Sequence, residues 1–210
     1  MTDSPLANGR LVSIAGALLV LAGCVALMGI ISAETFYPGY STARNAISDL
    51  GASEPPNSVI LQPSATIFNL TMIVTGLLVL ASALVLGRAG FVWVATLPLG
   101  LFGLGALLVG IFPGNWGTVH ALSALLTFVA GAVAAIAAAP VVRPPFRYMA
   151  PVLGAISLLT LVSFYVLGDS SPMLALGEGG LERWIAYPVL LFVLAFGGYL
   201  MGDAERSPAA

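Results

Sequence analysis

The chain contains no lysine, a single cysteine (Cys24) and a single histidine (His120). Without lysine, a Schiff base to retinal or pyridoxal phosphate is excluded, and so is a phosphate-binding loop of the lysine type. One cysteine excludes an internal disulfide and any iron–sulfur cluster. One histidine excludes a metal site built from several imidazoles. We therefore expect neither a cofactor nor a metal site.

Charge is also scarce. Charged residues make up 8% of the 210 residues and hydrophobic residues 59%, whereas an ordinary soluble domain has about 25% charged residues. Such a chain cannot cover itself with a water-compatible surface, so lipid must be the main solvent of its exterior. The seven arginines are dispersed and the net charge is −2, so nucleic acid is excluded as a partner. We expect membrane lipid as a partner, and the sequence leaves open a membrane-protein partner or a homo-oligomer.

Six apolar runs are long enough to cross the hydrocarbon core of a bilayer, which takes about 20 helical residues. They are residues 11–31, 66–87, 91–112, 120–141, 149–168 and 184–202. Ionisable residues fall at or beyond the ends of these runs, as expected when a charge at mid-membrane costs roughly 2.5–3.5 kcal/mol on insertion scales. The sequence therefore predicts an all-α fold: one six-helix transmembrane bundle over residues 1–210, with the first run retained rather than cleaved as a signal peptide.

The arginines predict the orientation. With the N-terminus inside, five of them lie on the inner side (Arg10, Arg88, Arg143, Arg147, Arg206) and two on the outer side (Arg44, Arg183). This matches the positive-inside rule and predicts a cell-membrane protein with both termini in the cytoplasm. Aromatic residues typical of interfaces fall at both predicted edges: Trp116, Trp184 and Tyr187 outside, and Trp93, Tyr148 and Tyr199 inside. Six of the nine acids would lie outside: Glu34, Asp49, Glu54, Asp169, Glu178 and Glu182.

The outer loop between the first two helices, residues 32–65, is too long to be a simple connection. Apolar side chains such as Tyr37, Tyr40 and Ile47 predict that it is ordered. Ser41 or Thr42 can cap a short helix that runs through Asp49 and stops at Gly51. A helix of this kind would bring a carboxylate, a guanidinium and hydroxyls into one patch, from residues Ser41, Arg44, Asn45, Ser48 and Asp49. The alternative is an interfacial helix whose polar residues satisfy only one another and the loop backbone.

Two further groups of polar residues lie near the predicted outer surface. His120 heads the fourth helix above small residues at helical spacing (Ala124, Thr127, Gly131, Ala135), which predicts that it tops an interior-facing edge. It can act as a general base, a proton relay or a single metal ligand, or it can cap the loop of residues 113–119. In the third outer loop, residues 169–183, we expect Gly177, Gly179 and Gly180 to form a flexible approach to Glu182 and Arg183. These two residues would open the sixth helix, where Glu182 would face the helix N-terminus.

We accordingly predict Asp49, His120 and Glu182 as candidate catalytic residues. The candidate ligand-binding residues are Arg44, Ser48, Asn69, Arg183 and Tyr40. Arg183 can hold an anionic group in bidentate fashion, and Asn69 can either line the floor of a pocket or hydrogen-bond between helices.

The segment Asn45-Ala46-Ile47-Ser48-Asp49-Leu50-Gly51 carries a resemblance to a known family, together with Val109 to Pro113, His120 and Gly180 to Arg183. In these residues the chain resembles the prokaryotic six-helix membrane proteins of domain of unknown function 998. The resemblance implies the architecture and supports one shared site, but it implies no reaction. Alkaline ceramidases also place polar residues at one membrane face, but they hold zinc with three histidines. Here a zinc site would need Asp49, Glu182, His120 and water, which is an unusual set of ligands.

Three functions fit these features. The first is a lipid- or amphiphile-binding or accessory membrane protein with a polar pocket at the outer face. The second is a membrane-embedded hydrolase, or another enzyme acting on lipid headgroups, that uses Asp49 and His120. The third is a small-molecule transporter, against which stands the lack of any ionisable residue at mid-membrane.

Overall fold

The computed structural model describes residues 9–206, without the side chains of Asp169, Glu205 and Arg206. The predicted positions of both chain termini and of the Asp169 and Arg206 side chains therefore lie outside the described part. The helices, in chain order, are α1 (Gly9–Thr35), η1 (Ser48–Leu50), α2 (Ser64–Arg88), α3 (Trp93–Ile111), η2 (Gly114–Trp116), α4 (Thr118–Ala137), η3 (Ala139–Val141), α5 (Phe146–Leu167), η4 (Gly168–Ser170), η5 (Pro172–Leu176) and α6 (Gly177–Arg206). The elements labelled η are short 3₁₀ helices.

Within the described residues, six helices are long and apolar enough to cross a membrane, so the predicted all-α six-helix fold of a multi-pass membrane protein is confirmed. The largest error in the predicted boundaries is at the start of the sixth helix, and three helix ends differ by four residues from their predicted positions. The sixth helix begins at Gly177, not at residue 184, because its polar first turns lie against the first loop and are helical despite their low hydropathy. Glu182 and Arg183 therefore lie in the second turn of α6.

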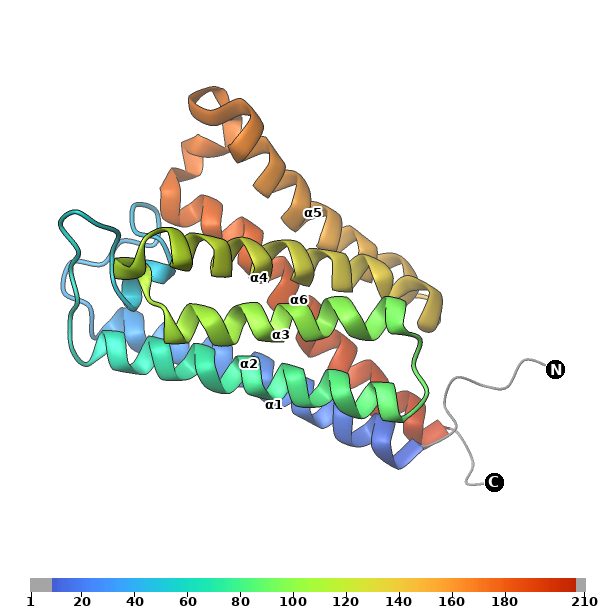
Figure 1. Ribbon diagram of the computed structural model, residues 1–210. Helices are drawn as coiled ribbons and strands as arrows, with labels where there is room; N and C mark the ends of the chain where they lie inside the picture. Colours follow the sequence, from blue (N-terminus) through green and yellow to red (C-terminus); the bar gives the residue numbers. More distant parts are fainter. Residues whose placement is uncertain (1–8, 207–210) are drawn as a thin grey trace.

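The helices run up and down around a ring in which α6 packs against α1 and closes the bundle (Figure 1). We name the two ends after their connections. The loop end carries residues 36–63 and the segment of η4 and η5, whereas the hairpin end carries the short α2–α3 and α4–α5 connections. At the loop end α5 diverges from α4, so the molecule is broader there than at the hairpin end (Figure 1).

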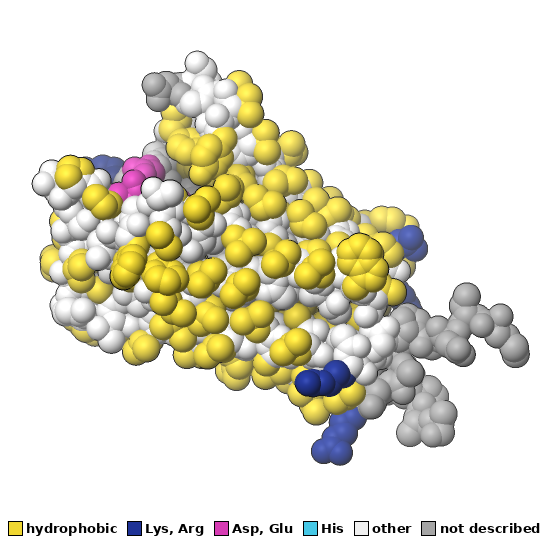
Figure 2. All heavy atoms as spheres, in the orientation of Figure 1, with side chains coloured by type: hydrophobic (Ala, Val, Ile, Leu, Met, Phe, Trp, Pro, Cys, Tyr) yellow, Lys and Arg dark blue, Asp and Glu magenta, His cyan; other side chains and the backbone are white. Residues whose placement is uncertain are grey.

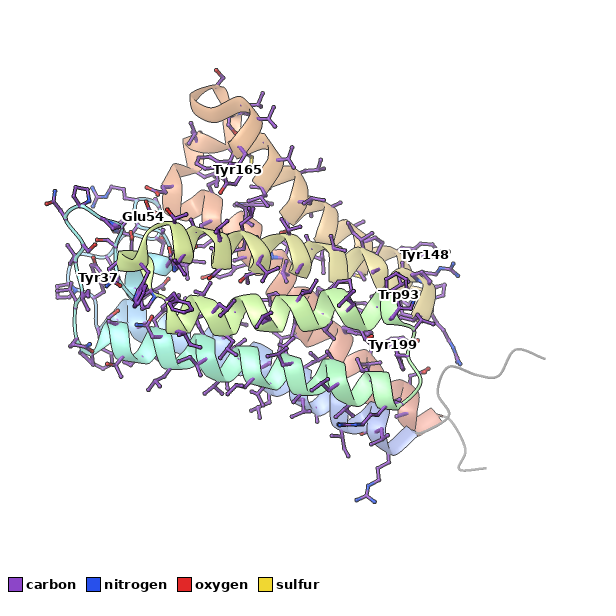
Figure 3. All side chains as sticks on the ribbon, in the orientation of Figure 1. Tyr37, Glu54, Trp93, Tyr148, Tyr165 and Tyr199 are labelled. Carbon is purple, nitrogen blue, oxygen red and sulfur yellow. The ribbon has the colours of Figure 1, made fainter. Side chains whose placement is uncertain are left out.

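Charged and aromatic side chains divide between the two ends. Arg10, Arg88, Arg143 and Arg147 belong to the hairpin end, whereas the acids of the first loop and of the start of α6 belong to the loop end. Between the ends the surface is mainly hydrophobic (Figure 2). Trp93, Tyr148 and Tyr199 lie together at the hairpin end (Figure 3). The distribution is that of a bundle with two polar rims and an apolar belt, which is what a bilayer requires.

Small residues allow the helices to approach closely. At the crossing of α1 and α6, a Cβ added to Gly16 would lie 2.6 Å from the carbonyl oxygen of Gly197, and one added to Gly197 would lie 2.7 Å from the carbonyl oxygen of Gly16. Gly76 of α2 and Gly103 of α3 meet in the same way. In lipid, such backbone contact is a main source of association between helices, because hydrophobic burial no longer distinguishes a neighbouring helix from a lipid tail.

Gly197→Leu is expected to push α1 and α6 apart and to lower the free energy of unfolding by about 2 kcal/mol, as overpacking does. Gly198→Leu is the matched control, because a Cβ at the neighbouring Gly198 would meet no atom within 4 Å. Thermal unfolding of the two purified variants in detergent measures the difference. Equal stability of the two variants would contradict the packing of the α1–α6 crossing described above.

Candidate functional site

The first loop does not form the short helix predicted from Ser41 to Asp49. It makes one hydrogen-bonded turn after Ser41 and becomes helical again only in η1. The reason is local: Asp49 Oδ2 accepts hydrogen bonds from the backbone N–H of Ala46 at 3.1 Å and from Asn45 Nδ2 at 3.4 Å, and Asn45 Oδ1 accepts one from the N–H of Ser41 at 3.0 Å. These side chains satisfy backbone groups that a helix would have used, which is how Asp and Asn compete with helices.

Arg183, on α6, binds this loop through hydrogen bonds and the end of α1 through an ion pair. Its Nη1 donates hydrogen bonds to the carbonyl oxygens of Thr42 at 2.9 Å and Asn45 at 3.3 Å. Its Nη2 forms an ion pair with Glu34 at 2.5 Å and donates to the Tyr40 hydroxyl at 2.8 Å. The guanidinium thus joins α6, the loop and the end of α1, and its charge is matched inside the protein. We call this set of contacts the arginine clamp.

Tyr40 is the second link between the clamp and the loop. Its hydroxyl donates to the carbonyl oxygen of Ala46 at 2.9 Å while it accepts from Arg183, and the Arg183 Cζ lies 5.6 Å from the centre of its ring. Burial raises the pKa of Tyr40 well above its ordinary value, so the hydroxyl keeps the proton that it donates at neutral pH. A tyrosinate could not make both bonds.

The glycines at the start of α6 provide contact, contrary to the flexible approach that we predicted. A Cβ on Gly177 would lie 2.2 Å from the carbonyl oxygen of Ala43, and one on Gly179 would lie 2.0 Å from that of Asn45. The N–H of Gly179 also donates to the Ala43 carbonyl at 3.0 Å. Any side chain at these two positions would force the loop away from α6, so glycine is required by the close approach of the two backbones.

Glu182 also binds the loop. We predicted that it would face the N-terminus of its own helix, but the exposed Glu178 occupies the first turn of α6. The Glu182 carboxylate instead accepts a hydrogen bond from the N–H of Ile47 and another from that of Ser48, at the start of η1. Glu182 and Arg183 therefore fix two different parts of the same loop.

Beneath η1 lies an internal cavity of about 70 Å³, enclosed mainly by apolar side chains of α1, α2, α3, α4 and α6. Its polar lining is confined to five residues, Ser48, Thr75, His120, Thr127 and Glu182. About 10–15 Å³ is enough to hold one water molecule, so this space can accommodate several waters or part of an alkyl chain.

His120 lies at the loop end of the cavity, and the prediction that it tops an interior-facing edge is confirmed. The residue is 4% exposed, and Ser123, Thr127, Gly131 and Ala135 below it are buried as well. Its Nδ1 lies 2.8 Å from the carbonyl oxygen of Phe112. Only a protonated nitrogen can bond to a carbonyl, so in the neutral imidazole Nδ1 carries the hydrogen and Nε2 is left as an acceptor.

Thr75 contributes an unusual polar atom to the cavity wall. The residue is 2% exposed, and within residues 9–206 its Oγ1 has no hydrogen-bond partner. Thr127, on the facing helix, donates to the carbonyl oxygen of Ser123 at 2.8 Å instead. A buried hydroxyl without a partner costs about 1–3 kcal/mol, so Thr75 is an uncompensated polar group in the cavity wall.

A groove of about 160 Å³ opens beside the cavity at the loop end, between α4, α5 and α6. The two hollows share Ser48, His120, Ala124, Phe128 and Glu182, so these residues form the wall between them. Glu54 on the loop and Tyr165 on α5 also line the groove (Figure 3). Acidic side chains appear at the surface in the hollow beneath the projecting end of α5 (Figure 2).

The structure thus brings three of the predicted site residues, Ser48, His120 and Glu182, to one wall, and it separates the others from it. Arg183 lines a different, shallow hollow of about 480 Å³ on another side of α6, beside Thr42 and Tyr187. The remaining predicted site residues do not line the cavity or the groove. Asp49 and Tyr40 form hydrogen bonds within the loop, and Arg44 is exposed. Asn69 packs against Gly51, and its buried Oδ1 has no hydrogen-bond partner in the described chain.

No set of three His, Cys, Asp or Glu side chains within residues 9–206 is grouped closely enough to hold a metal ion. The zinc set of Asp49, His120 and Glu182 is therefore not assembled in this structure. The Asp49 carboxylate is turned back toward Ala46, whereas that of Glu182 faces Ile47.

Two important residues, Glu34 and Thr75, were missed in the sequence. Glu34 ends α1, where the helix dipole disfavours a negative charge, and this mismatch was a usable signal that a cationic partner must lie nearby. Thr75 stands in the middle of an apolar helix and had no such signal, because threonine in a membrane helix usually bonds to its own backbone.

Arg183→Gln is expected to release the first loop, because it leaves the Glu34 carboxylate and several loop carbonyls without their donor. Breaking a fully buried ion pair costs about 3 kcal/mol, and this pair, with side chains 11% and 20% exposed, should cost less. Ala52→Cys, placed where the native side chain is 1% exposed, reports the release through its reaction with a membrane-impermeant maleimide in a Cys24→Ser background. Arg44→Gln, which removes an exposed arginine from the same loop, is the control and should leave the introduced thiol protected. Equal protection in both variants would show that the arginine clamp does not hold the loop.

Residues 20–199 match a family described as protein of unknown function, DUF998. No curated protein and no solved structure matches the chain. The matched region runs from α1 to α6 and includes the arginine clamp, the cavity and the groove. The resemblance carried by the Ser48-Asp49-Leu50-Gly51 motif is thereby confirmed, and the chain belongs to the DUF998 family of membrane proteins.

Proposed function

We propose that the protein binds a lipid or another amphiphile at its loop end, with the apolar part in the cavity and the polar end in the groove. The observation that carries this proposal is a cavity of about 70 Å³, lined mainly by apolar side chains, that shares the polar residues Ser48, His120 and Glu182 with the groove. Interiors of proteins are packed about as densely as organic crystals. A void enclosed mainly by apolar side chains and open to a polar groove is therefore best explained by an amphiphilic ligand.

Small side chains create the void. Ala26, Ala106 and Ala124 line it from α1, α3 and α4. A leucine at any of them would fill space that now lacks packing contacts and would add the stabilisation that comes with burying apolar surface. Three of the five polar lining residues, Ser48, His120 and Glu182, lie in the wall toward the groove. The site therefore has a mainly apolar end and a polar end, as an amphiphile has.

The ligand would enter from the side. The groove lies where α5 diverges from α4 (Figure 1), and Leu125, Leu161 and Phe164 line it on the side of these two helices. A molecule already dissolved in the bilayer would reach this opening without passing through water. Phe128 is the bulky apolar side chain in the wall between groove and cavity, and its rotation would admit an alkyl chain.

The distribution of arginines supports a location and an orientation. Four of the arginines whose side chains are described belong to the hairpin end, so by the positive-inside rule this end faces the cytoplasm, with both termini. The loop end and its groove would then open toward the outer half of the cell membrane. There the protein acts as a binding or accessory component, alone or with a membrane partner.

Ala106→Leu is expected to fill the cavity and to weaken retention of a copurifying amphiphile at least tenfold, measured by native mass spectrometry of protein released from mild detergent. Thr75→Val is a smaller change, because valine has nearly the same shape as threonine and lacks only the hydroxyl. It should raise the free energy of unfolding of the empty protein by about 1 kcal/mol, because it removes an unsatisfied hydroxyl, and it should leave retention of an alkyl chain unchanged.

Gly198→Leu and Thr96→Val are the matched controls. Gly198 faces open space, and Thr96 lies near the hairpin end of α3, away from the cavity. If Ala106→Leu retained as much amphiphile as Gly198→Leu, the cavity would not be the binding site.

A second candidate function, hydrolysis of an amphiphile, has one observation in its favour. The hydrogen bond between His120 Nδ1 and the Phe112 carbonyl leaves Nε2 as an acceptor in the wall that also contains Ser48 and Glu182. A neutral imidazole with a free Nε2 is the form that a general base requires.

This second function predicts that the protein in nanodiscs cleaves a long-chain carboxylic ester and that His120→Gln abolishes turnover while the amphiphile is still retained. Product formation is measured by mass spectrometry, with Asn69→Ala as a polar substitution outside the groove. If the unmodified protein gives no turnover above that of empty nanodiscs, binding alone remains.

A further inference from the structure

We infer that the polar end of the bound amphiphile is cationic, either a protonated amine or a quaternary ammonium group. The inference rests on the proposed function and deepens it by naming the chemical class of the ligand. Two observations support it: the ionisable and aromatic groups that line the groove, and the position of the nearest arginine along the chain.

The ionisable side chains that line the groove are acids and one histidine. Glu54 comes from the first loop, and Glu178 and Glu182 come from successive turns of α6. Glu54 and Glu178 are exposed at the mouth of the groove, and Glu182 lies in the wall to the cavity. Within the described chain no arginine lines the groove, so a positively charged group would be attracted there and an anionic one repelled.

The arginine nearest along the chain, Arg183, does not offset this charge. Its guanidinium is on another side of α6, where it pairs with Glu34 and binds the carbonyl oxygens of the loop. The guanidinium of Arg183, the one cationic group in this part of α6, therefore has a structural role in the arginine clamp. The anionic headgroup that we expected Arg183 to hold has no counterpart in the groove.

The uncharged groups of the groove also suit a cation. The His120 Nε2 is an acceptor, because Nδ1 is bonded to Phe112. Phe128, Phe164 and Tyr165 offer aromatic faces, which attract ammonium groups and are the usual partners of quaternary ammonium ligands. An acidic cluster alone would be a solvated surface. Here the acids lie at the mouth of a groove that shares a wall with the cavity of the unpartnered Thr75.

Three probes with the same twelve-carbon chain test the inference: dodecyltrimethylammonium, dodecyl maltoside and dodecyl sulfate. Binding to the full chain in nanodiscs of neutral lipid is measured against empty nanodiscs, which report partitioning into lipid. We expect the ammonium probe to bind at least tenfold more tightly than the sulfate probe, with the maltoside between them.

The double variant Glu54→Gln/Glu178→Gln is expected to reduce the preference for ammonium over sulfate at least fivefold and to leave maltoside binding unchanged. Both side chains are exposed, so the fold is preserved. Ala106→Leu should weaken all three probes alike, because it removes the space for the chain that they share.

The outcomes separate the two claims. If the three probes bind equally or the sulfate binds best, the cationic headgroup is overturned while the amphiphile-binding function stands. A preference for ammonium that survives undiminished in the double variant would show that Glu54 and Glu178 do not bind the headgroup, and would overturn its placement at the mouth of the groove. If none of the probes binds to the unmodified protein above the level of empty nanodiscs, the proposed function fails together with the inference.

Discussion

The loop end depends on one ion pair, between Arg183 of α6 and Glu34 at the end of α1. Each residue would be poorly placed alone: Glu34 meets the negative end of its helix dipole, and Arg183 is largely withdrawn from water. Together they close the ring of helices at the point where the chain leaves α1, and the remaining donors of the guanidinium fix the loop above the cavity. The loop over the proposed binding site therefore depends on a charge pair as well as on the packing of Ile47 and Leu50.

The sequence was sufficient for the architecture because lipid imposes a simple rule. A run of about 20 apolar residues must be helical, since no other conformation satisfies its backbone in hydrocarbon. The rule does not apply to the polar residues at the ends of the helices, and the errors in the predicted structure lie there. The start of α6 was placed seven residues late because Gly177, Glu178 and Gly179 are not apolar. Their helical state depends on contact with Ala43 and Asn45, which are remote in sequence.

The candidate site was predicted in part for the same reason. His120 was recognisable from the small residues below it at helical spacing, and Glu182 from its place beside an apolar run. Their association with Ser48 follows from the path of the loop, which hydrogen bonds of Asp49, Tyr40 and Arg183 determine. We predicted those three residues as ligand-binding or catalytic groups, because a sequence does not reveal that a polar group is already satisfied by the backbone of a distant segment.

The divergence of α5 has a consequence for the surrounding bilayer. Since the helices spread toward the loop end (Figure 1), the protein displaces more lipid area from one leaflet than from the other. A protein that is wider at one end relieves the stress on lipid packing where the leaflet around its wide end is stretched. It adds to that stress where the same leaflet is compressed. The shape that opens the groove thus also couples the protein to the curvature of its membrane.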